Sequence, residues 1–242
     1  MGTHKFTVVL HRVAALLLLA AFSNGAWAGR PLGTDDAATA DLATCLIESW
    51  SERTGSQRAL VAGAACGVAK GFELGVDYTH PHPRDVVRGE SGLALKWVPE
   101  SWSHETTAGK LNLGLKFHVG FEHPVRHDWR DSEASVLGLA TLLLNDEWMI
   151  HANLGPVRNR QSHYTAGALS TAVMWTPHEH FFLFAEVDAN TRSAVFGGTV
   201  KTLGGRVWLI KDVFGIDLTA SRESGSASTL WTVGFGWYGI AF

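Results

Sequence analysis

Charged and amide side chains that could form ion pairs or contact a polar solute recur at alternate positions of apolar segments. Glu48, Glu73, Arg206 and Asp217 are the best candidates, because each lies in a segment that alternates between apolar and polar residues. Alternate residues of a strand share one face, so these side chains would line a common polar surface. Two interpretations stay open, a salt-bridged interior that supports the fold or the lining of a selective pathway. The same parity adds four residues to this predicted network: Lys96, Lys116, Asn153 and Glu186.

Patterns for catalysis and metal binding are weaker. Histidine is abundant, with 12 residues, but its spacing in the predicted loops matches no metal-ligand pattern. Ser162 with His163, and His151 with Asn153, have the residue types of a hydrolase, yet the sequence contains no G-x-S-x-G motif. We therefore predict that the protein is not an enzyme and that it has no metal site and no cofactor.

The elements that must position the charged side chains are predicted to be β-strands. Residues 72–78, 111–119, 148–154 and 214–221 alternate between apolar and polar side chains, with Met149 as an exception. A period of two with one apolar face is typical of half-buried strands, and helical spacing fits none of these segments better.

Twelve strands can be counted. The connections between them alternate between two sets, one mostly short and the other mostly long. The exception is the connection 99–109, which is long where a short one is expected. An even strand number and this alternation of turns are typical of single-chain bacterial outer-membrane barrels. The predicted fold class is therefore all-β: an antiparallel transmembrane β-barrel of about twelve strands, with both termini in the periplasm. The expected strands are 43–53, 57–67, 71–79, 91–98, 110–119, 134–145, 147–155, 163–175, 180–188, 199–210, 213–222 and 228–242.

The first 28 residues have the pattern of a secretory signal peptide. A basic stretch precedes ten apolar residues, Val13 to Phe22, and an A-x-A cleavage site follows at Ala26 to Ala28. Ten apolar residues are too few for a helix that spans a bilayer. We predict that residues 1–28 are cleaved and that the protein is located in the bacterial outer membrane.

The next segment, residues 29–42, shows no alternation, and the barrel is predicted to occupy residues 43–242. The segment could be a periplasmic extension, a plug folded into the lumen, or a flexible tail. As a plug it would place the carboxylates of Asp35 and Asp36 near a lumen lysine or arginine.

The last predicted strand is rich in glycine and aromatic residues and ends on Phe242. It resembles the C-terminal signal of bacterial outer-membrane barrels, which implies the barrel-assembly machinery as a partner. Trp237, Tyr238 and Phe242 are the aromatic residues of this predicted signal. The bulky residues change parity near Tyr238, which a β-bulge would explain.

Five short segments in order also resemble a known family: Arg30–Ala37, Cys45–Trp50, Phe72–Gly75, Arg206–Leu209 and Ile216–Thr219. The family consists of bacterial outer-membrane β-barrels described as transporter-like and is similar to the meta-pathway phenol-degradation barrel group. The resemblance implies a channel-like protein for hydrophobic or aromatic compounds, and it implies no catalytic residues.

The two cysteines are predicted to form a disulfide across the first hairpin. A turn at Gly55-Ser56 makes paired residue numbers sum to 111, so Cys45 lies opposite Cys66. The oxidising periplasm permits the bond. The same register places Arg53 opposite Arg58, an unfavourable pair that a register slip near the tip would relieve.

The expected function is passive transport or binding of a small molecule, for which hydrophobic and aromatic compounds are candidates. Trp50, Phe182, Phe184 and Trp208 point inward by parity and are the sequence evidence for such a solute. Three alternatives remain: a structural or adhesive barrel, a lipid-modifying outer-membrane enzyme, and a soluble periplasmic β-domain. Twenty basic and 23 acidic residues give a net charge of −3, so no nucleic-acid partner is expected. The expected partners are outer-membrane lipid and a small hydrophobic solute.

Overall fold

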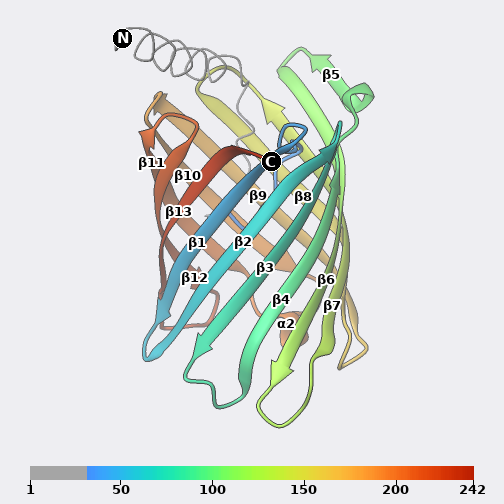
Figure 1. Cartoon of the computed structure of the whole chain (residues 1–242), viewed down its shortest axis with the longest axis vertical. Coiled ribbons are helices and arrows are strands. Elements are labelled where there is room, and N and C mark those ends of the chain that lie inside the picture. The colour runs from blue at the N-terminus through green and yellow to red at the C-terminus, as the bar shows by residue number, and fades with distance from the viewer. Residues whose placement is uncertain (1–31) are drawn as a thin grey trace, which may run out of the picture.

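The structure, a computed structural model, describes residues 32–242, which form a closed antiparallel β-barrel (Figure 1). The sheet has 13 strands, but β5 pairs only with β6, so twelve strands form the ring. The ring closes through the β1–β13 and β4–β6 pairs. The strands are β1 Thr44–Thr54, β2 Gln57–Ala69, β3 Phe72–His82, β4 Val87–Trp97, β5 Ser103–Thr106, β6 Gly109–Pro124, β7 Arg130–Leu143, β8 Trp148–Asn159, β9 Thr165–His178, β10 Phe181–Asn190, β11 Val200–Ile210, β12 Phe214–Glu223 and β13 Leu230–Ala241.

The predicted fold class is confirmed, and the differences lie in the connections. The expected connection 99–109 contains the short helix η2, Glu100–Trp102, and the strand β5. At the opposite end, β3 runs to His82 and β6 to Pro124, so the expected loops 80–90 and 120–133 shorten to residues 83–86 and 125–129. Apolar and polar residues alternate less clearly there, because a strand that leaves the membrane has water on both faces. A further helix, α2 (Ser193–Phe196), lies in the connection between β10 and β11.

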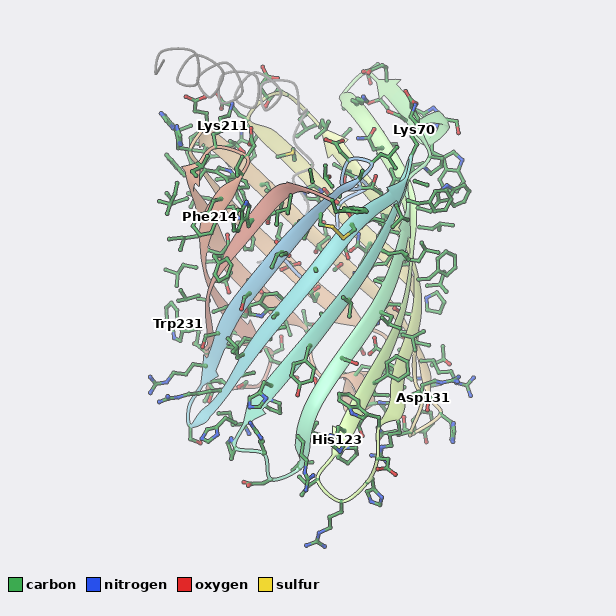
Figure 2. All side chains as sticks on the ribbon, in the orientation of Figure 1. Lys70, His123, Asp131, Lys211, Phe214 and Trp231 are labelled. Carbon is green, nitrogen blue, oxygen red and sulfur yellow. A yellow bond between two sulfur atoms is a disulfide. The ribbon has the colours of Figure 1, made fainter. Side chains whose placement is uncertain are left out.

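We call the end at which β1 begins and β13 ends the terminal end, and the opposite end the loop end. Figure 2 places Lys70 and Lys211 at the terminal end, and His123 and Asp131 at the loop end. The signal peptide predicted for residues 1–28 lies outside the described residues. Within residues 32–242, no helix is long and apolar enough to cross a membrane.

The apolar face of each strand points away from the barrel. Leu74 and Val76 on β3 are 50% and 52% exposed, and Leu218 on β12 is 54% exposed. Trp231 projects outward from β13 (Figure 2). An exposed apolar band around a closed sheet is the surface of a membrane barrel, because closure satisfies every strand edge within lipid. This outward direction excludes the soluble β-domain, in which the same faces would form the core.

The first hairpin keeps the predicted register along its whole length. Cys45 pairs with Cys66, their Cα atoms are 4.0 Å apart, and the two residues form a disulfide. No slip occurs at the tip, where Arg53 stays opposite Arg58. The register holds because the β1–β2 ladder is paired without a break as far as the two-residue turn.

Replacement of both cysteines by serine is expected to lower the free energy of unfolding by about 3 kcal/mol, because the bond closes a short loop in the unfolded chain. The sequence separation of the two cysteines is 21 residues. Denaturant midpoints in one detergent would measure the difference. Reduced wild type should match the Cys45→Ser/Cys66→Ser variant, and equal midpoints for the variant and the oxidised wild type would contradict the prediction.

The change of parity expected near Tyr238 occurs one residue later. Thr232, Gly234, Gly236 and Tyr238 face the interior in unbroken alternation. The ladder with β1 shifts register beyond Trp237, where the backbone of Gly239 has a φ of 70°. Glycine adopts this left-handed conformation readily, so the bulge lies at the terminal end of β13.

Candidate functional site

Residues 32–40 run inside the barrel and residues 41–43 lead from there to β1, and we call the whole stretch 32–43 the lumen segment. Leu32, Thr34, Asp36 and Ala37 are all less than 8% exposed. The side chains are mostly small, which lets an extended chain fit between the walls. The described part of the predicted extension 29–42 thus lies within the lumen (Figure 1).

One wall holds the start of the lumen segment through backbone groups. The Glu186 carboxylate on β10 accepts hydrogen bonds from Gly33 N at 3.1 Å, from Thr34 Oγ1 at 2.6 Å, and from Thr34 N. The Asn153 side chain on β8 accepts from Asp35 N at 2.7 Å and donates to Asp35 O at 2.8 Å. Asn153 thereby pairs with both backbone groups of one residue, as a neighbouring strand would.

The next contacts lead across the lumen to the opposite wall. Thr141 Oγ1 on β7 accepts from Ala37 N at 2.8 Å, and Glu73 Oε2 on β3 accepts from Ala40 N at 2.7 Å. In the twelve-strand ring, β3 and β10 are six strands apart in either direction. The lumen segment therefore crosses the whole interior, from Glu186 to Glu73.

Gly67 on β2 lets the lumen segment leave the interior along the wall. Ala43 N donates to Gly67 O at 2.9 Å. A Cβ atom on Gly67 would lie 2.2 Å from Asp41 O, so any other residue there would collide with the lumen segment.

Two lysines neutralise the carboxylates of the lumen segment. Lys96 Nζ on β4 lies 3.1 Å from Asp35, 3.2 Å from Asp36 and 3.6 Å from Glu73, and its side chain is 5% exposed. Lys116 on β6 forms a second ion pair with Asp35. Lys96 is therefore the cation shared by three carboxylates in a buried site.

The two aspartates of the lumen segment titrate in opposite directions. Burial raises the pKa of the Asp36 carboxyl to about 6, against the attraction of Lys96. Burial also opposes ionisation of Asp35, but Lys116 and Lys96 more than offset this and hold its pKa well below the usual value. Asp36 is thus the first of the two to take up a proton on acidification.

A second polar cluster, which we call the arginine cluster, joins four consecutive strands. Arg206 on β11 binds both carboxylate oxygens of Asp217 on β12, at 2.6 and 2.8 Å. Arg206 Nη2 lies 3.6 Å from Glu48 on β1. The Tyr238 hydroxyl on β13 accepts from Arg206 and donates to Glu48. The cluster thus bridges the pair of strands, β1 and β13, that closes the barrel.

Aromatic rings surround the Arg206 guanidinium. Its central carbon lies 4.9 Å from the ring centroids of Trp208 and Tyr238 and 5.7 Å from that of Phe182. These distances are within the range of cation–π contacts. Two of the four aromatic residues that parity placed inside, Phe182 and Trp208, therefore contact the arginine. The other two, Trp50 and Phe184, are also buried.

The eight residues of the predicted network thus fall into two groups. Five contact the lumen segment or its carboxylates: Glu73, Lys96, Lys116, Asn153 and Glu186. Three belong to the arginine cluster: Glu48, Arg206 and Asp217. Sequence reasoning missed the role of Thr141, which carries no charge, and placed Tyr238 only in the C-terminal signal. The other aromatic residues of that signal, Trp237 and Phe242, are 52% and 73% exposed.

Solved structures that share this architecture are outer-membrane proteins. The KdgM porin matches with a TM-score of 0.57 at 11% identity, and the NanC porin with a TM-score of 0.60 at 4% identity. Each match covers 79% of this chain and 98% of the porin. The chain has the fold of a bacterial outer-membrane β-barrel. No protein-family model matches the sequence, and a search of curated proteins finds no significant relative.

Outer membrane phospholipase A from Escherichia coli also shares the fold of this outer-membrane barrel, with a TM-score of 0.50 at 12% identity over 86% of this chain and 93% of that chain. Two of the hydrolase-type residues, Ser162 and His151, have other hydrogen-bond partners. Ser162 Oγ donates to Asn159 Oδ1 at 2.9 Å, whereas His151 lies inside the barrel, 2.9 Å from Thr141 Oγ1 and 3.0 Å from Met174 Sδ. Within residues 32–242, no group of three or more His, Cys, Asp and Glu side chains is placed to hold a metal ion.

The outer-membrane barrel keeps open space beside the lumen segment. A cavity of about 140 Å³ lies between this segment and β1–β4, and another of about 200 Å³ lies on the side of β10–β13. A third cavity, of about 380 Å³, lies at the loop end. The first cavity is lined by Glu73, Asp77, Lys96 and Lys116, and the second by Glu52, Glu186, Thr202 and Thr219, among others.

Proposed function

We propose that the protein is a passive outer-membrane channel for small polar solutes and that the lumen segment is a plug that narrows it. The observation that carries this proposal is the polar cavity space that remains inside a closed barrel on both sides of the lumen segment. A filled, apolar interior would serve only as a structural core, whereas charged and hydroxyl side chains around open space can hydrate a path.

The fold shared with the KdgM and NanC porins supports the proposal. One of the matching structures is the KdgM porin in complex with disordered oligogalacturonate. Oligogalacturonate is a polyanion, which a positively charged lumen would favour. Among the described residues that line the first two cavities, carboxylates outnumber lysines, and Lys96 and Lys116 are those lysines. We therefore propose a different solute, a small polar molecule that does not carry a uniform row of negative charges.

The residues that line the cavities also argue against the hydrophobic or aromatic solute that the phenol-degradation resemblance implies. Phe182 and Trp208 pack around the Arg206 guanidinium. Glu52, Glu186 and Thr202 line the neighbouring cavity. This arrangement favours polar solutes over aromatic ones.

Planar-bilayer recordings would test the proposal. The purified mature protein is expected to give discrete conductance steps, and a potassium chloride gradient is expected to give a reversal potential of cation-selective sign, because carboxylates outnumber cations around the cavities. Folding would be checked by a heat-dependent shift in SDS gels. Folded protein without conductance would contradict the channel, and release of fatty acid from phospholipid by the same preparation would favour the enzyme instead.

A further inference from the structure

The wall that faces the lumen segment has the chemistry of a peptide-binding site. Glu186, Glu73 and Thr141 accept backbone N–H groups, and Asn153 pairs with both backbone groups of Asp35. Each of these four residues is less than 9% exposed. Buried polar groups require partners, and here the partners are the backbone of an extended chain rather than other wall residues alone.

Lys96 and Lys116 add a carboxylate subsite to this wall. Asp35 lies between them, and Asp36 contacts Lys96. Wall carboxylates thus face backbone N–H groups, while wall lysines face side-chain carboxylates. This alternation of sign fits a peptide with adjacent acidic residues and does not fit a uniform polyanion.

The space around the lumen segment also limits the size of the side chains that a bound peptide can carry. Ala37 and Ala40 are 1% and 9% exposed. Large side chains at these two places would collide with the wall. The matching ligand therefore has small residues around its acidic pair.

We propose that the lumen wall is a binding site for short, extended peptides with adjacent carboxylates and small side chains, and that the lumen segment is its tethered occupant. The inference rests on the proposed channel function and names its solute class. In the intact protein the tether keeps the lumen segment at an effective concentration that is roughly millimolar, so a free peptide competes poorly unless the tethered copy is weakened.

The test uses the full mature chain carrying Asp35→Asn and Asp36→Asn, reconstituted in planar bilayers. A synthetic peptide with the sequence of residues 32–41 is added, and a second peptide carries Asn at the same two aspartates. The acidic peptide is expected to reduce conductance with a half-effective concentration at least about tenfold below that of the Asn peptide, because charge-assisted hydrogen bonds to the lysines are lost in the latter.

The control variants separate a specific site from general charge effects. Addition of Lys116→Gln is expected to shrink the difference between the two peptides to under about threefold. Addition of Lys201→Gln, which removes an exposed lysine on β11, should leave the difference unchanged. Equal effects of both peptides, or no effect at millimolar concentration on a conducting barrel, would overturn the peptide site and leave the channel standing. Folded barrels that never conduct would overturn the channel itself.

If the substituted chain does not fold, the mature chain without residues 32–41 replaces it, and fluorescence anisotropy of a labelled peptide in detergent measures binding directly. Binding that weakens at least about tenfold for the Asn peptide supports the site, whereas equal or absent binding overturns it.

Discussion

Replacement of Lys96 by methionine is expected to release the lumen segment and to raise single-channel conductance several-fold. Lys96 is the cation between Asp35, Asp36 and Glu73. Without it, Asp36 and Glu73 lose the cation between them, and removal of one partner of a buried ion pair typically costs about 3–5 kcal/mol. A cost of that size shifts the ratio of docked to released segment by a factor of roughly 100 or more.

Conductance and cleavage by an aspartate-specific protease would report the release independently. In the wild type the lumen segment should resist cleavage at Asp36, which is 4% exposed, and in Lys96→Met it should be cut. The matched control is Lys70→Met, because Lys70 pairs with Glu100 at the surface, with side chains 83% and 79% exposed. Surface pairs contribute little, so this variant should behave as wild type. Unchanged conductance together with unchanged protection in Lys96→Met would show that the segment is held by other contacts.

Replacement of Arg206 by leucine is expected to destabilise the barrel by about 3–5 kcal/mol. The Arg206 side chain is 1% exposed and its partners Asp217 and Glu48 are 5% and 9% exposed, so both carboxylates would lose a buried cation. Urea midpoints in detergent, or the temperature at which the barrel loses its unheated mobility in SDS gels, would measure the loss.

Two further variants separate charge imbalance from loss of packing. Arg160→Leu removes a pair with Asp131 whose side chains are 45% and 48% exposed, and it should cost under about 1 kcal/mol. Arg206→Leu combined with Asp217→Leu should recover part of the stability, because an apolar pair replaces an uncompensated carboxylate. A double variant no more stable than Arg206→Leu would indicate that the arginine acts by filling space among the aromatic rings.

Alternation in the sequence was sufficient to predict which face each side chain occupies. It predicted the inward position of Glu48, Lys96 and Arg206, where the structure also places them, because parity is a local property of a strand. It could not predict partners. Asp35 meets Lys96 across the lumen, yet residues 32–43 have no periodicity from which a path could be derived.

Tyr238 and β5 show two other limits of the pattern. The bulky, amphipathic ring of Tyr238 would fit the lipid headgroup region as well as the barrel interior. Its contacts with Arg206 and Glu48 show that it lies in the interior. β5 has the sequence Ser-His-Glu-Thr and extends beyond the ring, where no apolar face is needed. A strand surrounded by water leaves no hydrophobic period to detect.

The position of the arginine cluster has a consequence for the order of folding. Tyr238 and Glu48 are 190 residues apart in the chain. Contacts of such high contact order form late, because the entropy of closing a long loop opposes them until the intervening strands have assembled. The cluster thus forms only when the first and last strands of the ring meet. Contacts made after the folding transition state slow unfolding rather than speed folding. The four side chains are therefore expected to lower the unfolding rate of the closed barrel, because they hold the first and last strands of the ring together.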